Sequence, residues 1–228
     1  MDKRIIRVNM SEAYRYMGCR GTPQGDLLKD LEAAAKLVES SVLSREVLRI
    51  CDIERTGALT LKETGLVLEG KAVAALLHDS EKCAIFCATL GSDIEALIRK
   101  WQLKDLAFAA MLDACANSAI ENVCDDIEAE LREAYAAQGL YLTDRFSPGY
   151  GDLPITLQSA FCTALDTTRR IGVTVSESSI MIPRKSVSAL IGISSKPQKH
   201  RDTGCVDCLV GPACHYLRNG VTCYGQAL

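Results

Sequence analysis

The chain has 228 residues, of which 48% are hydrophobic and 24% charged, with a formal net charge of −3. This balance excludes a disordered chain, and the acidic charge, together with few aromatic residues, argues against a nucleic-acid partner. The apolar stretches are too short to span a bilayer and the N-terminus lacks a signal-peptide pattern. We therefore expect a cytoplasmic protein without a membrane partner.

The first part of the chain predicts a helix followed by a mixture of strands and a short helix. Apolar residues recur at helical spacing where a helix is expected, and at shorter alternation where strands are expected. In chain order these are a helix at residues 24–43, strands at 47–53 and 58–61, a helix at 70–78 and a buried strand at 82–90.

The second part is dominated by one long helix. Before it, Ser92 is expected to open a shorter helix as its N-cap, with Glu95 completing a capping box. The long helix begins near Leu106, ends at Gly139 and would measure about 45 Å. Beyond it we expect a short strand at 140–142, a helix at 157–171, strands at 173–175, 180–182 and 187–193, and a polar linker at 195–204. Because strands and helices do not alternate strictly, the fold class is α+β.

The segment Arg145-Phe146-Ser147-Pro148-Gly149-Tyr150-Gly151-Asp152 is the strongest candidate for a binding loop. Its glycines and proline favour a tight turn with exposed backbone amides. Arginine grips a carboxylate through two hydrogen bonds, and tyrosine offers a flat apolar face with a polar tip. The loop therefore suits a small ligand that carries a carboxylate and a ring. An ordinary surface loop has the same composition, so that alternative stays open.

Two motifs resemble the activation domain of cobalamin-dependent methionine synthase. The first is Arg145-x-x-Pro148-Gly149-Tyr150, and the second is Met181-x-Pro183-x-x-Ser186-Val187-Ser188, in the same order and at a similar separation as in that family. The resemblance is clear over about residues 105–195. It extends to the segment at residues 9–21, which looks like the start of short, free-standing members.

The resemblance implies a role for each matching residue. Arg145 would hold the carboxylate of S-adenosylmethionine, and Tyr150 would face a corrinoid. The remaining implied contacts with the ligand come from the loop backbone at Phe146, Ser147, Pro148 and Gly149, from Ser186 and Ser188, and from Asp113 and Glu121 on the long helix. The last two have an equally good alternative as part of a solvated polar face. The family's acidic contact between Gly139 and Arg145 is not recognised in this sequence.

For the whole molecule, the resemblance implies a twisted, mainly antiparallel sheet with flanking helices, formed by residues 1–195. Residues 196–228 are expected to be a linker and a Cys-rich tail. The implied function is the reductive re-methylation of cob(II)alamin, or another corrinoid, on a separate methyltransferase such as a methionine synthase lacking its activation domain. S-adenosylmethionine supplies the methyl group and a ferredoxin or flavodoxin the electron. No catalytic base or nucleophile is needed, since the cofactors carry the chemistry.

The tail holds four cysteines at Cys205, Cys208, Cys214 and Cys223. Four thiolates can close a zinc site or hold an iron–sulfur cluster, and His215 could replace one sulfur. Reduced thiols without metal are the remaining alternative. The family does not require such a tail.

Two other functions therefore remain open. The first is an iron–sulfur redox protein that delivers electrons to a corrinoid protein and has a degenerate S-adenosylmethionine site. The second is a scaffold that keeps the fold without either chemistry.

Overall fold

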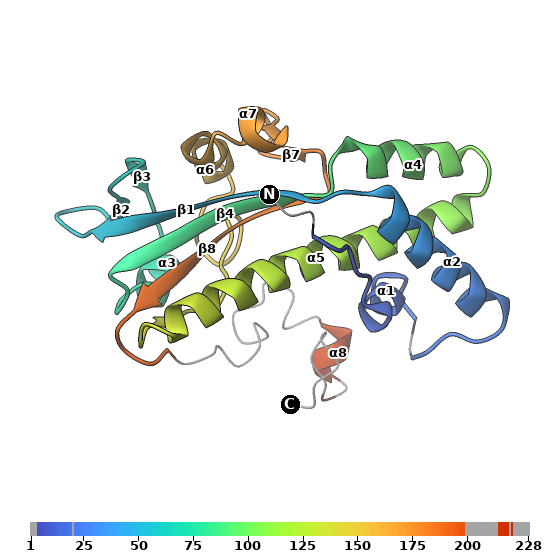
Figure 1. Cartoon of the computed structure of the whole chain (residues 1–228), viewed down its shortest axis with the longest axis horizontal. Helices are drawn as coiled ribbons and strands as arrows, with labels where there is room; N and C mark the ends of the chain where they lie inside the picture. The colour runs from blue at the N-terminus through green and yellow to red at the C-terminus, as the bar shows by residue number, and fades with distance from the viewer. Residues whose placement is uncertain (1–3, 20, 199–213, 219, 221–228) are drawn as a thin grey trace.

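A computed structural model describes residues 4–19, 21–198, 214–218 and 220 of the chain (Figure 1). The elements are, in chain order, α1 (Met10–Tyr16), α2 (Asp26–Ser41), β1 (Arg45–Glu54), β2 (Thr60–Leu61), β3 (Leu66–Val67), α3 (Lys71–Leu76), β4 (Lys82–Thr89), α4 (Ser92–Gln102), α5 (Leu106–Ala136), β5 (Tyr141–Leu142), α6 (Leu157–Leu165), α7 (Thr167–Ile171), β6 (Thr174–Val175), β7 (Met181–Ile182), β8 (Ser186–Ser194) and α8 (His215–Arg218).

The main sheet has six strands in the order β3-β2-β1-β4-β8-β5, and all its pairings are antiparallel. β4 lies at the centre, where Cys83 pairs with Cys51 of β1 and with Gly192 of β8. After its first residue β4 is buried throughout, because helices cover both faces of the sheet. β6 and β7 form a separate two-stranded sheet. The predicted α+β fold with an antiparallel sheet and one long helix is confirmed.

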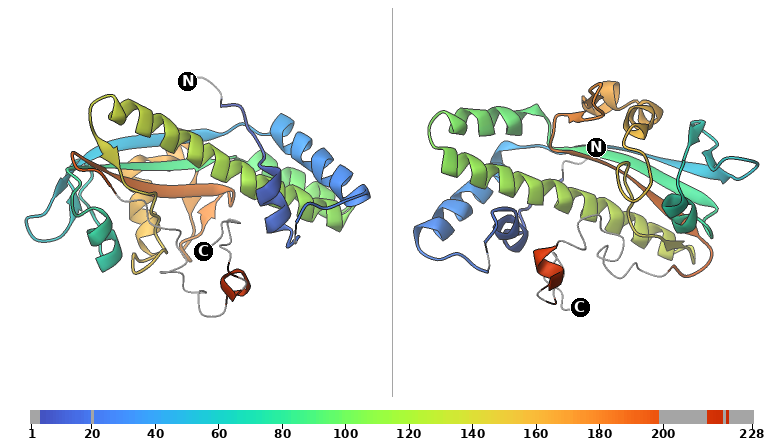
Figure 2. Two further views of the ribbon diagram at one scale, coloured as in Figure 1. Left: turned by 90° about the horizontal axis from the view of Figure 1, so that it is seen from below. Right: turned by 180° about the vertical axis from the view of Figure 1, so that it is seen from behind.

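The sheet separates two hydrophobic cores. Side chains of a strand point alternately to opposite faces, so Phe86 packs with α1, α2, α4 and α5 on one face, whereas Ile85 packs with α3, α6 and α7 on the other. Figures 1 and 2 show α5 running along one face, with α6 and α7 on the opposite side. The cysteines at positions 51, 83, 87, 115 and 124 belong to these cores, Cys162 is also buried, and Cys19 is partly buried.

α5 has 31 residues and was predicted at close to this length. Its N-cap is Asp105, whose side chain accepts a hydrogen bond from the amide of Phe108 at 3.0 Å. A stripe of small and apolar residues buries the helix against the sheet, and Gly139 ends the following turn with a φ of +73°. The other face of α5 remains available to line a site.

Two details of the helix predictions are wrong. The expected helix at residues 157–171 is divided into α6 and α7, because Asp166 adopts a left-handed conformation with a φ of 53°. Ser92 is not a capping residue: Gly91 occupies the N-cap position of α4 without a side-chain bond, and Glu95 instead accepts from the amide of Arg184.

Three short elements, α1, β3 and α8, were not predicted as secondary structure. The N-cap of α1 is Asn9, whose side chain accepts from the amides of Ser11 and Glu12. Among the described helices, none combines the length and the apolar character that crossing a membrane requires.

Candidate functional site

A cavity of about 680 Å³ lies between α5, α1, the loop before α6, and β8. We call it the α5–β8 cavity. It is lined by Glu12, Arg15, Tyr16, Glu121, Asp125, Glu128, Asp144, Arg145, Ser147, Pro148, Tyr150, Ile155, Gln158, Met181, Ser186, Val187 and Ser188. The cavity therefore brings together side chains from both sequence motifs, although Arg145 and Ser186 lie far apart in the sequence.

The loop at residues 145–152 is held in place by its own backbone. Phe146 exchanges two backbone hydrogen bonds with Leu190 of β8, at 3.0 and 2.8 Å, and its side chain is buried in the core. Gly149 and Gly151 have φ values of 92° and 53°, and a side chain on Gly151 would come within 3.3 Å of the Phe146 ring. These glycines allow the chain to turn sharply above Phe146.

The far end of the loop is attached to α3. The carboxylate of Asp152 accepts hydrogen bonds from the amides of Lys71 and Ala72, at 2.6 and 2.9 Å. These bonds hold the pKa of Asp152 below its ordinary value. Between the two anchors, Tyr150 projects from the loop with 66% of its surface exposed.

The guanidinium of Arg145 faces three carboxylates on α5. One terminal nitrogen donates to Asp125 at 2.9 Å and lies 3.6 Å from Glu128, and the other donates to Glu121 at 3.2 Å. The three acidic residues are three or four positions apart, so the helix presents them on one face. Arg145 keeps 21% side-chain exposure, which leaves it accessible from the cavity.

The cavity is strongly acidic. Its lining has five carboxylates, at Glu12, Glu121, Asp125, Glu128 and Asp144, and two guanidinium groups, at Arg15 and Arg145. Partial burial raises the pKa of Glu121, and Asp125 and Glu12 add to this rise while Arg145 opposes it. The arrangement can attract a cation to the α5 side and still offer one arginine to an anionic group.

The opposite wall is formed by two serines with their hydroxyl groups already bonded. Ser186 donates to the carbonyl of Pro183 at 2.6 Å and contacts Thr89 Oγ1 at 2.8 Å. Ser188 bonds to the side-chain amide of Gln158, at 2.7 and 3.1 Å. Both serines are buried, so this wall supplies mainly shape and packing.

Three predicted site residues lie away from the cavity lining. Asp113 forms an ion pair with Lys185 at 2.8 Å, the Phe146 ring is in the core, and the Gly149 amide donates to Leu153. Glu121, Arg145, Ser147, Pro148, Tyr150, Ser186 and Ser188 do line it.

The sequence analysis missed several lining residues. Asp144, which directly precedes Arg145, lines the cavity but was not singled out in the sequence. Glu12, Arg15 and Tyr16 come from α1, and the matching segment at residues 9–21 was the available signal. Gln158 was missed because a glutamine on a helix carries no pattern of its own.

Three of the four tail cysteines, Cys205, Cys208 and Cys223, lie outside the described residues. Cys214 is described and partly buried. Within the described ranges, no three His, Cys, Asp or Glu side chains are grouped as metal ligands.

Comparison with known proteins agrees with the geometry. The family model "Vitamin B12 dependent methionine synthase, activation domain" matches residues 73–201, which is more than half of the chain. A crystal structure of the MetH reactivation domain bound to AdoHcy superposes with a TM-score of 0.64 at 16% sequence identity, covering 95% of this chain and 82% of that one. No curated protein matches the sequence. The family match and the shared fold establish that this chain belongs to the family of the activation domain of vitamin B12-dependent methionine synthase.

Proposed function

We propose that the chain binds S-adenosylmethionine in the α5–β8 cavity and supports the reductive re-methylation of a corrinoid on a separate methyltransferase. The observation that carries this proposal is the meeting, in one cavity, of Arg145 and a row of carboxylates on α5. S-adenosylmethionine needs both kinds of group, because it carries a carboxylate beside an ammonium and a sulfonium cation.

Different residues of the cavity would bind different groups of the ligand. Arg145 has five N–H donors and uses two of its nitrogens for the α5 carboxylates, so it can also take the ligand carboxylate through a further N–H. Glu121, Asp125 and Glu128 lie next to it and attract the two cationic groups. Ser147 and Pro148 line the cavity, and their backbone would contact the adenosine part of the ligand.

The rim of the cavity suits a docked corrinoid protein. Tyr150 and Ile155 line the cavity and are largely or half exposed. Ile180 and Ile182, on either side of the lining residue Met181, also expose about half of their surface. Exposed apolar groups of this kind mark contact surfaces. The proposed partner is a corrinoid-dependent methyltransferase, such as a methionine synthase without its own activation domain.

In the proposed reaction, one electron reduces Co(II) to Co(I), and Co(I) takes the methyl group from the sulfonium, leaving S-adenosylhomocysteine. A ferredoxin or flavodoxin is the proposed electron donor. The role of this chain is to bind and orient the methyl donor. We further propose that residues 1–195 form the binding domain and residues 196–228 a separate tail.

The test is a calorimetric titration with S-adenosylmethionine. We expect binding by the natural chain and a loss of about a hundredfold in Arg145→Ala, about 3 kcal/mol. Arg145→Lys keeps the charge that the α5 carboxylates need but loses the planar fork, so it separates binding from folding.

Arg169→Ala is the matched control, since Arg169 is 85% exposed on α7 and does not line the cavity. Failure of the natural chain to bind, or equal affinity in Arg145→Ala, would contradict the proposal.

A further inference from the structure

One edge of the main sheet carries backbone groups without partners. β1 pairs with β4 along most of its length, but with β2 only at its last two residues. The amide of Ile53 donates to Glu81 on the β4 side at 3.0 Å, whereas the carbonyl of Asp52 accepts from Lys62 on the opposite side at 3.0 Å. This difference identifies which β1 residues turn their backbone outward.

In an antiparallel strand the N–H and C=O groups of alternate residues point to the same side. Those of Glu46, Leu48 and Ile50 therefore point away from β4. No residue in the described part of the chain hydrogen-bonds to the backbone of these three. We call them the open β1 edge. A row of free donors and acceptors is a template for another strand.

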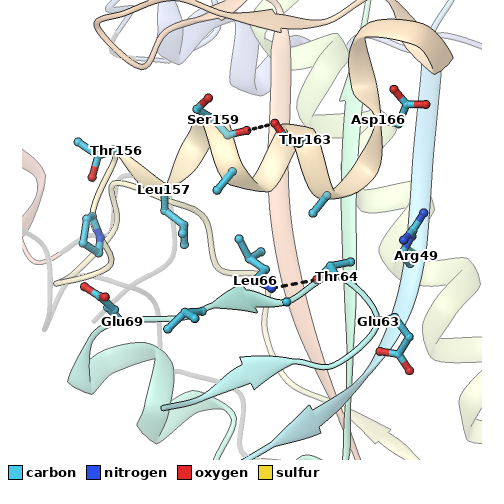
Figure 3. A pocket seen from close by; sticks show the side chains of 15 residues that line it. Arg49, Glu63, Thr64, Leu66, Glu69, Thr156, Leu157, Ser159, Thr163 and Asp166 are labelled. Atoms are coloured by element: carbon cyan, nitrogen blue, oxygen red, sulfur yellow. Dashed lines mark hydrogen bonds between the residues drawn. The ribbon is translucent and has the colours of Figure 1, made fainter.

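Space for side chains exists on both faces of this edge. On the α6 side, a groove of about 940 Å³ runs between α6 and the β2–β3 hairpin, and Figure 3 shows Arg49 of β1 at one end of it. On the α5 side, a cavity of about 210 Å³ has an apolar floor of Leu48, Phe86, Ile127 and Leu131. Its rim carries Arg4, whose charge is already balanced by ion pairs with Glu46 and Glu130. Alternate side chains of an added strand would enter these two spaces in turn.

The charges of Arg45 and Arg49 indicate what side chains a strand added to this edge should carry. Arg45 and Arg49 share the α6 face of β1; within the described residues neither forms an ion pair, and Arg45 donates only to the carbonyl of Ile171, at 3.5 Å. The carboxylates in the groove, at Glu63, Glu69 and Asp166, all lie beyond ion-pair distance of Arg49. A side chain directly opposite Arg45 or Arg49 is thus best an acid.

A second copy of this chain fits poorly. If two copies paired along this edge, the backbone groups of Glu46, Leu48 and Ile50 would bond to those of the same residues in the other copy. Directly opposite residues place their side chains on the same face, so Arg45 and Arg49 of both copies would gather on one face and repel each other. We propose that the open β1 edge takes a strand from a partner protein, with carboxylates facing Arg45 and Arg49 and apolar side chains on the α5 side. No residue of this edge lines the α5–β8 cavity, so the inference stands apart from the proposed function.

The probe is a short synthetic peptide of alternating glutamate and valine with blocked ends. We expect it to bind the full chain, and to slow amide hydrogen exchange at Glu46, Leu48 and Ile50. A peptide of alternating lysine and valine should bind roughly tenfold more weakly or worse. The glutamate–valine peptide with alternate amides N-methylated should not bind, because it cannot complete the ladder.

Arg49→Glu should reverse the preference between the two peptides, whereas Arg169→Glu, on exposed α7, should leave it unchanged. A folding check by circular dichroism accompanies both variants. Absence of binding, equal binding of the N-methylated peptide, or binding without slower exchange at the three amides would each overturn the proposal. A dimer in solution with these amides already protected would assign the edge to a second copy, and would overturn it too.

Discussion

The two walls of the α5–β8 cavity are built in different ways. On the α5 wall, the one partner that Glu121 and Asp125 have among the described residues is the guanidinium of Arg145, and both carboxylates line the cavity. On the β8 wall, the hydroxyl groups of Ser186 and Ser188 are already hydrogen-bonded to Thr89 and Gln158. Glu121, Ser186 and Ser188 were all named by the same resemblance, yet their surroundings differ. In the proposed complex the α5 wall would recognise charge, and the β8 wall would set the shape of the cavity.

Of the changes to the two walls, the removal of charge from the α5 wall should have the largest effect. In the double variant Glu121→Gln/Asp125→Asn, the sulfonium cation loses its counter-charges, so S-adenosylmethionine should bind about thirtyfold more weakly, about 2 kcal/mol. S-adenosylhomocysteine, which lacks the sulfonium charge, should lose much less. Calorimetric titration of both ligands gives the ratio. Equal losses for the two would show that the carboxylates do not read the charge.

A change in the β8 wall should affect folding more than binding. Ser188→Ala leaves the buried amide of Gln158 short of a partner, which should lower the free energy of unfolding by about 1–3 kcal/mol. The affinity for S-adenosylmethionine should change by no more than about twofold. Urea unfolding and the same titration test this. A large loss of affinity without a loss of stability would make Ser188 a direct ligand contact.

The pH dependence should follow Glu121. Because partial burial raises its pKa, Glu121 takes up a proton at a higher pH than an ordinary carboxyl group. Affinity for S-adenosylmethionine should therefore fall by a few-fold as the pH is lowered through that range, and Glu121→Gln should flatten this part of the profile. A profile that is unchanged in the variant would show that another group titrates.

The raised pKa of Glu121 also predicts how the stability of the fold changes with pH. A carboxyl group with a raised pKa in the folded state binds its proton more tightly there than in the unfolded chain. The contribution of Glu121 to the free energy of unfolding should therefore increase as the pH falls through the folded-state pKa, and decrease as it rises. The free energies of unfolding of the natural chain and of Glu121→Gln, measured in urea across this pH range, differ by the contribution of Glu121.

The smallest expected effect is that of salt. Added salt screens the carboxylates at the mouth of the cavity, so S-adenosylmethionine should bind a few-fold more weakly at high ionic strength. S-adenosylhomocysteine should respond less, since it carries one positive charge fewer. A stronger response by S-adenosylhomocysteine would mean that Arg145 dominates the recognition.

Most of the fold was predictable because its elements have clear periodicity. The 31-residue helix α5 and the buried strand β4 follow directly from their apolar patterns. The break at Asp166 was not predictable, because an aspartate in a left-handed conformation leaves no pattern in the sequence. Short elements such as β3 depend on pairing with distant partners, which local sequence does not reveal.

The site residues could be predicted where a recognised motif itself forms part of the cavity. Arg145, Tyr150 and Glu121 line the cavity as expected, but Asp113, on the same helix, faces Lys185 instead. Eight positions separate Asp113 from Glu121, about 12 Å along the helix, so only the tertiary structure tells which one reaches the loop. Glu12 was missed because only the tertiary structure brings α1 to the cavity, although the matching segment at residues 9–21 pointed to that region.

A crystal structure of the chain with S-adenosylmethionine tests the central claim most directly. We expect the ligand carboxylate on the guanidinium of Arg145, with the sulfonium turned toward the carboxylates of α5. A ligand bound elsewhere, or a cavity without ligand at a concentration that saturates binding in solution, would contradict the account.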